Sequence, residues 1–198
     1  MSNYAERGRT PPHAIMRDDP PPIVLIKEEH QIFRELFDRV ESAEGDALIG
    51  LSGEICARLV IHMNIEEDIL YPALKEVVSI EEVDEGIVEH QLAGTLIRDI
   101  LGMTGREEIF KSKVHVLGEE TMHHIDEEDS ELFEDAKKAW KQGKIDLVEL
   151  GEQLRARRKE LYDHLDSLGR DTDQLKIEMP VGDEVEELST SVPRRATD

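Results

Sequence analysis

Aromatic residues are scarce in this sequence, at 4% of the chain, whereas charged residues reach 35%. Folds rich in β-strands draw on aromatic and β-branched side chains, so this composition favours helices. The single cysteine, Cys56, excludes an intramolecular disulfide and fits a reducing compartment. The N-terminal residues include no apolar signal segment, and we expect no apolar run long enough to cross a bilayer. We therefore predict a cytoplasmic protein that does not enter a membrane.

Basic residues are also few, with 24 Lys and Arg against 46 Asp and Glu, which gives a formal net charge of −22. Such a chain is a poor binder of nucleic acid and is repelled by an anionic membrane surface. We interpret the acidity mainly as a solvated surface that keeps the protein soluble. The composition thus predicts no nucleic-acid partner.

The 198 residues suffice for one domain with a real core. Residues 1–22 hold five of the eight prolines, which predicts an extended arm. Residues 169–198 are polar and acidic with little apolar periodicity, which predicts a disordered tail. The helical domain is therefore expected within residues 23–168.

Apolar residues recur at spacings of three and four in four strong stretches and a weaker fifth. The stretches are 23–42, 47–78 (with a kink or end expected at Pro72), 80–101, 106–141 and, more weakly, 145–168. Short links between four long helices predict an all-α, up-down-up-down antiparallel four-helix bundle. The additional C-terminal helix could cap this bundle or pack onto a partner, for example in a homodimer.

A histidine pattern occurs twice along the chain. The segment EEHQIFRELF around His30 aligns with VEHQLAGTLI around His90, 60 residues later. The segment HMNIEEDILYP, which begins at His62, aligns with HIDEEDSELFE, which begins at His124. Each of these two carries a glutamate four residues on, at Glu66 and at Glu128, so histidine and glutamate share a helix face.

Each of the four histidines lies on the apolar stripe of a different helix. A carboxylate inside a bundle is costly unless it is paired or bound to metal, and these stripes hold no Lys or Arg. We therefore predict a dinuclear metal site, with a polar core network that holds no metal as the alternative. The candidate ligands are His30, His62, Glu66, His90, His124 and Glu128.

Several neighbouring residues compete for these roles. His123 and Glu127 form a second i, i+4 pair, but their helix face is mostly polar, so we prefer His124 and Glu128. The roles of the remaining candidates stay open. Glu67 and Asp129 either are exposed acids or supply an extra oxygen to the metal, and Glu29 and Glu89 either support the site or face solvent. Tyr71 either packs in the core or lines the pocket.

Imidazole and carboxylate ligands suit Fe, Mn or Zn. Two carboxylate bridges with open positions form an arrangement that iron uses with O₂, peroxide or NO. The residues alone leave the choice among these metals open.

The HxxxE segment with its LYP-like tail, the EEH opening and the EH of the third helix resemble the hemerythrin-like, or HHE cation-binding, domain across residues 23–142. The resemblance implies a four-helix bundle around two non-haem iron ions joined by an oxo or hydroxo bridge. It implies that the four histidines are terminal ligands and that Glu66 and Glu128 are bridges.

The sequence departs from the oxygen-carrying members of that family at two positions. Gly94 stands where they have a second third-helix histidine, and Glu128 lies four residues after His124, where they have a carboxylate five residues on. We therefore expect binding, sensing or detoxification of O₂, NO or peroxide, with weak catalase-like activity, rather than oxygen carriage. The alternatives are iron storage or donation for iron–sulfur repair, and a regulatory module with a structural metal.

Overall fold

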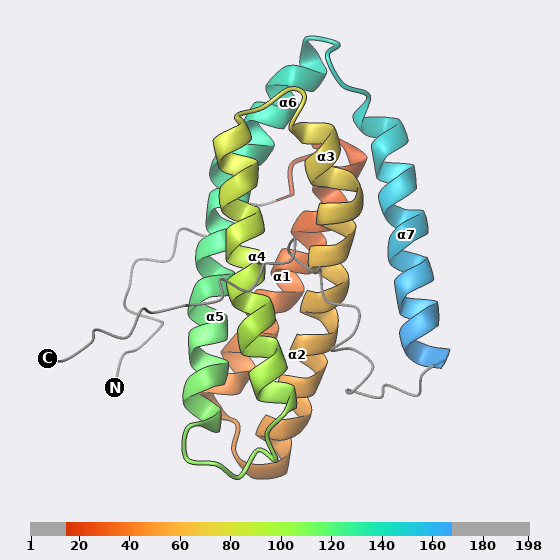
Figure 1. Ribbon diagram of the computed structural model, residues 1–198. Coiled ribbons are helices and arrows are strands. Elements are labelled where there is room, and N and C mark those ends of the chain that lie inside the picture. The colour runs from red at the N-terminus through yellow and green to blue at the C-terminus, as the bar shows by residue number, and fades with distance from the viewer. Residues whose placement is uncertain (1–14, 168–198) are drawn as a thin grey trace, which may run out of the picture.

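The computed structural model describes residues 15–167 (Figure 1). The predicted tail, 169–198, lies outside the described residues, as does most of the predicted arm, 1–22. The described residues form helices and no strands.

Four long helical segments run in alternating directions to make a bundle, and a further helix lies along its side (Figure 1). The elements are α1 (Pro21–Ser42), α2 (Gly45–Ile65) continued by η1 (Glu66–Leu70) and α3 (Tyr71–Leu74), α4 (Ile80–Leu101), α5 (Phe110–Glu127) continued by η2 (Glu128–Leu132) and α6 (Phe133–Lys141), and α7 (Leu147–Ser167). This arrangement confirms the predicted all-α bundle with its additional C-terminal helix.

Helix boundaries differ from the predicted ones where proline and turn residues decide them. The first helix begins at Pro21 rather than at residue 23, because proline is tolerated in a first turn whose N–H groups have no helical partner. The second segment ends at Leu74 instead of residue 78, and the fourth begins at Phe110 instead of residue 106. The third helix matches its predicted range.

Two of the bundle segments contain a five-residue π-helical turn, which the periodicity did not predict. In η1 the N–H of Tyr71 donates to the carbonyl of Glu66, and in η2 the N–H of Phe133 donates to the carbonyl of Glu128. Pro72 follows the first turn, but no proline lies near the second, so proline is not required for the widening. Such turns are rare and occur mostly at functional sites.

Buried apolar residues form two separate clusters. The first core includes Phe33, Ile55 and Ile97 and lies toward the link between α1 and α2. The second core includes Ile26 and Leu70 and lies at the other end, where it also takes in α7. Along α1 and α4, the histidine of the repeated pattern falls between the residues of these two cores, and along the other two segments it lies near the change from one core to the other.

The helix α7 packs on α1 and α2 with an apolar face. The buried residues of this face are Leu147, Leu150, Leu154, Leu161 and Leu165. The approach is close at Gly151, where a Cβ atom would lie 2.7 Å from the Cβ of Pro21. Its apolar face is therefore covered by the side of the bundle, and the predicted contact with a partner stays a prediction.

One helical stretch, Gly45–Leu74, is long and apolar enough to cross a membrane by length and composition alone. This corrects the expectation that no run would reach that length. Most of the stretch is buried within the bundle, as a core helix of a soluble protein would be, so it is weak evidence for a membrane span.

Candidate metal centre

The six predicted ligand residues lie together in the middle of the bundle, between the first and second cores. Their exposed fractions are low: His30 0%, His62 1%, Glu66 0%, His90 4%, His124 6% and Glu128 4%. Each bundle segment contributes one histidine, because the repeated pattern places it on the inward face at the same height. The two glutamates each begin one of the π-helical turns.

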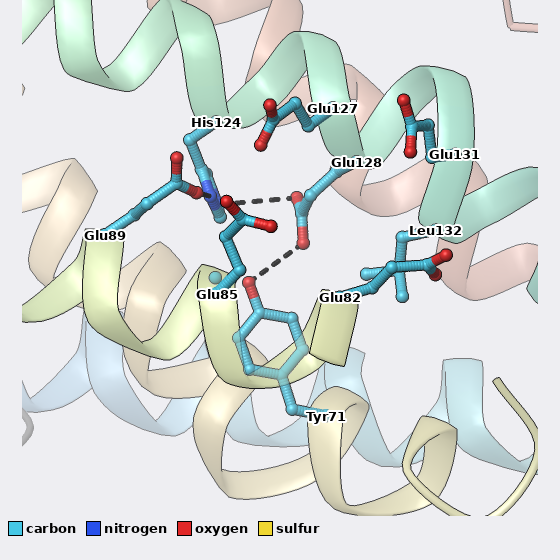
Figure 2. A pocket seen from close by; sticks show the side chains of 10 residues that line it. Tyr71, Glu82, Glu85, Glu89, His124, Glu127, Glu128, Glu131 and Leu132 are labelled. Carbon is cyan, nitrogen blue, oxygen red and sulfur yellow. Dashed lines mark hydrogen bonds and ion pairs between the residues drawn. The ribbon is translucent and has the colours of Figure 1, made fainter. Parts of the chain in front are cut away.

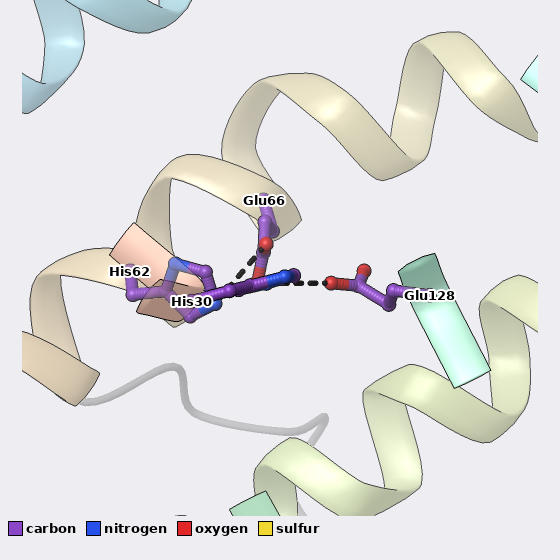
Figure 3. Close-up of side chains that lie close together, drawn as sticks. All are labelled: His30, His62, Glu66 and Glu128. Atoms are coloured by element: carbon purple, nitrogen blue, oxygen red, sulfur yellow. Dashed lines mark ion pairs between the residues drawn. The ribbon is translucent and has the colours of Figure 1, made fainter. Parts of the chain in front are cut away.

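A first group of donors comprises His30, His62, Glu66 and Glu128, whose ligand atoms all lie within 4.8 Å of one another (Figure 3). The Nε2 atom of His62 is 3.3 Å from Oε1 of Glu66. The Nε2 atom of His30 is 3.3 Å from Oε2 of Glu128. This group has the size and donor types of a single cation site.

A second group comprises Glu66, His90 and His124, within the same 4.8 Å limit. Nε2 of His90 lies 3.4 Å from Oε2 of Glu66, and Nε2 of His124 lies 3.6 Å from Oε2 of Glu128. Glu66 thus belongs to both groups, and Glu128 faces a histidine from each. The arrangement is that of two adjoining cation sites joined by carboxylates.

The inward atoms of this centre include buried polar atoms that have no hydrogen-bond partner. They are Nε2 of His30, Nε2 of His62, both side-chain oxygens of Glu66 and Oε2 of Glu128. Leaving such atoms unsatisfied costs about 1–3 kcal/mol each, and more for charged groups. A cation at each group would satisfy all of them, and imidazole with carboxylate donors fits Fe, Mn or Zn.

The outward nitrogen of every histidine in the centre contacts a carboxylate. The Nδ1 distances are 3.1 Å for His30–Asp129, 3.0 Å for His62–Glu29, 2.9 Å for His90–Glu67 and 2.8 Å for His124–Glu89. A carboxylate accepts a hydrogen bond from Nδ1–H and so leaves the Nε2 lone pair facing inward, where a cation can use it.

These contacts settle alternatives that the sequence left open. Glu29 and Glu89 support the histidines rather than only facing solvent. Asp129 is 1% exposed and contacts the outward side of His30, so it is neither an exposed acid nor part of either inward group. The signal lay in the repeat, which places a glutamate directly before His30 and directly before His90.

Among the described residues, arginines pair with the supporting carboxylates of only one half of the centre, the half that contains His30 and His62. Nη2 of Arg34 lies 3.2 Å from Oδ2 of Asp129, and Nε of Arg158, on α7, lies 2.6 Å from Oε1 of Glu29. Among residues 15–167, neither Glu67 nor Glu89 pairs with Lys or Arg. No helical periodicity could have predicted Arg158, because its contact depends on how α7 packs.

The electrostatics agree with a site built for cations. Burial and the neighbouring Glu128 carboxylate raise the pKa of Glu66 well above its usual value. Burial and the adjacent His124 ring hold the pKa of His90 well below its usual value. In the absence of a cation, ionisation of both buried carboxylates is energetically unfavourable.

Tyr71 lines the centre and also packs in the second core, so it takes both of the roles that the sequence left open for it. Its hydroxyl donates to Oε1 of Glu128 at 3.0 Å and lies 3.4 Å from Nε2 of His90. Gly86 on α4 makes room for it, because a Cβ atom there would lie 2.8 Å from the hydroxyl oxygen.

A pocket beside α4 and α5 reaches this centre (Figure 2). Its lining residues are Tyr71, Glu82, Glu85, Gly86, Glu89, His124, Glu127, Glu128, Glu131 and Leu132. His123 lies at the surface, with 60% of its side chain exposed, and pairs with Glu127 at 3.2 Å. This placement agrees with the register that chose His124 for the interior.

The comparisons with known proteins agree with this architecture. The family model of the hemerythrin HHE cation-binding domain matches residues 22–136, more than half of the chain. A crystal structure of a hemerythrin HHE cation-binding domain-containing protein from Mycobacterium kansasii is similar, with a TM-score of 0.65 and 21% sequence identity. That match covers 79% of this chain and 97% of that chain, and at this identity it shows the fold alone. No curated protein matches.

Proposed function

Because this chain belongs to the hemerythrin HHE cation-binding domain family, we propose that its buried centre holds two iron ions and reacts with O₂, NO or peroxide. One observation carries the proposal: two groups of buried donors adjoin and share Glu66. A single structural cation would leave the donors of one group unsatisfied.

The proposed ligands divide into ends and bridges. His30 and His62 would hold one ion, and His90 and His124 the other. Glu66 and Glu128 would join the two, since each faces histidines of both groups. Each ion would then have two imidazoles and a share of two carboxylates, which leaves positions free for a small ligand.

When bound, paired iron ions supply the redox and ligand-binding chemistry, and the chain supplies the surroundings. The first and second cores keep bulk water from the centre on two sides. Burial and the Glu128 carboxylate raise the pKa of Tyr71 well above its usual value, so its hydroxyl stays protonated. It can therefore donate a hydrogen bond to Glu128 or to a small molecule beside His90.

The residue Gly94 favours reactive chemistry over reversible oxygen carriage. It is buried on α4, one turn after His90, and offers no third imidazole to that half of the centre. An ion held there would keep an additional open position. We therefore infer sensing or removal of peroxide or NO in preference to oxygen transport, with weak catalase-like turnover.

The test is metal analysis of the purified protein together with its optical spectrum. We expect close to two irons per chain and a near-ultraviolet band typical of bridged iron, with spectral changes on adding peroxide, NO or O₂. One tightly bound zinc and no iron, after growth in iron-replete medium, would contradict the proposal.

The acidic lining of the pocket also favours a second function, storage or donation of iron. Chelation separates the two, because a donor must release iron readily whereas a ligand-binding centre must retain it. Iron that stays bound during prolonged exposure to a chelator would support the ligand-binding function.

A further inference from the structure

The pocket lies between the surface and the second group of donors. Figure 2 shows the side chains of α4 on one side, those of α5 and η2 on the other, and Tyr71 beneath them. His124 and Glu128 belong both to the centre and to the lining of this pocket. It is therefore a path along which a small ion could reach the centre.

Besides Glu128, the pocket lining holds five charged side chains, all of them acidic. They are Glu82, Glu85, Glu89, Glu127 and Glu131. A cleft lined by one sign of charge raises the local concentration of the opposite ion and speeds its arrival. The other half of the centre differs, because Arg34 and Arg158 lie behind its histidines.

The floor of the pocket carries an unsatisfied acceptor. Glu128 is 4% exposed, and its Oε2 atom is buried without a hydrogen-bond partner. Surface acids alone would only indicate solvation, but a buried carboxylate oxygen without a donor indicates a cation. The pocket therefore leads from carboxylates near the surface to a buried Glu128 oxygen that a cation would satisfy.

A third group of possible donors lies at the mouth of the pocket, where Glu89, His123 and Glu127 offer ligand atoms within 4.8 Å of one another. Nε2 of His123 is 3.2 Å from Oε1 of Glu127 and 3.8 Å from Oε1 of Glu89. The other oxygen of Glu89 contacts Nδ1 of His124 at 2.8 Å. One carboxylate thus joins the mouth to the buried centre.

We propose that Glu89, His123 and Glu127 form an outer site for a divalent cation and that the pocket carries cations from this site to the buried centre. The site has one imidazole, two carboxylates and access to water, which suits an ion that binds briefly and moves on. The proposal rests on the proposed function only in that the buried centre binds cations.

The test measures Co²⁺ binding to the full-length metal-free protein. In the variant His123→Gln/Glu127→Gln the outer donors are lost, while Glu89 is kept because it also supports His124. The matched control is His115→Gln/Glu119→Gln, an i, i+4 pair on the same helix that does not line the pocket. Tightly held Co²⁺ is the amount that stays bound when the protein is desalted in the presence of a chelator. Weakly held Co²⁺ is the additional amount that is bound at equilibrium in dialysis.

We expect the wild type and the control to hold one weakly bound Co²⁺ that the His123→Gln/Glu127→Gln variant lacks. We expect the tightly held Co²⁺ to reach the same final amount in all three proteins, but about tenfold more slowly in that variant, especially at low salt. Equal loading rates would overturn the proposal, as would a weakly bound ion that persists in the variant. Failure of the proposed function would show instead as absent iron reactivity, which this comparison does not measure.

Discussion

The carboxylates behind His30 and His62 are each paired with an arginine, whereas those behind His90 and His124 have no such partner among the described residues. The pKa values do not follow this division, since burial also lowers the pKa of His62, which lies in the half with arginines. Burial lowers the pKa of His30, but its hydrogen bond to Asp129 and the nearby Glu128 carboxylate outweigh burial and leave the pKa raised. The pKa of His90 lies well below its usual value.

The difference between the halves shows that a repeated ligand motif does not make two equal sites. The pattern supplies the same inward donors twice, but Arg158 comes from α7, which lies beyond the matched domain, residues 22–136. In one half, arginines hold the supporting carboxylates from outside, and the other half carries Tyr71 and the pocket.

Removing the shared carboxylate should have the largest effect, because it abolishes the distinction between the halves. We expect Glu66→Ala to lose both ions, since the carboxylate serves both groups. His62→Ala should lose mainly the ion of its own half. Metal analysis after desalting measures both. His123→Ala is the control and should keep two ions, and an empty centre in this variant would mean that the fourth-helix register is wrong.

Replacing Arg158 should make the halves more alike. Without this arginine the Glu29 carboxylate is less fixed, and His62 is less well oriented toward an ion. We expect Arg158→Gln to weaken retention of one ion about tenfold, a usual effect for groups behind a ligand. Competition with a chelator measures it.

The matched control for that experiment is Arg157→Gln. Arg157 lies on the same helix with 32% of its side chain exposed, against 31% for Arg158, but pairs with Asp68 at the surface. We expect Arg158→Lys to recover part of the loss. Tighter binding in Arg158→Gln would show that the arginine charge, rather than its positioning of Glu29, dominates.

Removing the hydroxyl of Tyr71 probes the other half. Tyr71→Phe leaves Oε1 of Glu128 without its donor, and we expect the metal-free protein to lose about 1–3 kcal/mol of unfolding free energy. Chemical denaturation measures this loss. Tyr162→Phe, which removes a hydroxyl from a half-buried ring on α7, should cost less.

The smallest expected effect is a change in pH dependence. Burial and the charge of Asp68 raise the pKa of Glu67 to about 7 from its usual value of 4.5. The stabilisation from this group is therefore complete below about pH 4.5 and is lost as the pH rises through about 7. We expect Glu67→Gln to flatten that part of the stability profile of the metal-free protein. The exposed Glu76→Gln is the control, and an equal change there would contradict the assignment.

The sequence predicted the bundle, and the six candidate ligand residues lie together in the structure, because a stripe of apolar residues fixes which way His62 and Glu66 point. It did not predict the contacts that cross between elements distant in the chain. Tyr71 reaches Glu128 only because Gly86 makes space on a third segment, and Arg158 reaches Glu29 only because α7 packs on α1. Such contacts depend on the packing of helices, which periodicity within one helix does not report.

The separation of the first core from the second has a consequence for cooperativity. Between them, a layer of histidines and carboxylates interrupts the apolar packing in all four bundle segments. In the metal-free protein this polar layer couples the two cores only weakly. Heating should therefore unfold the two ends of the bundle in separate steps, with a calorimetric enthalpy of unfolding above the van't Hoff value. Two bound cations link every segment at that height, and the protein should then melt in a single transition.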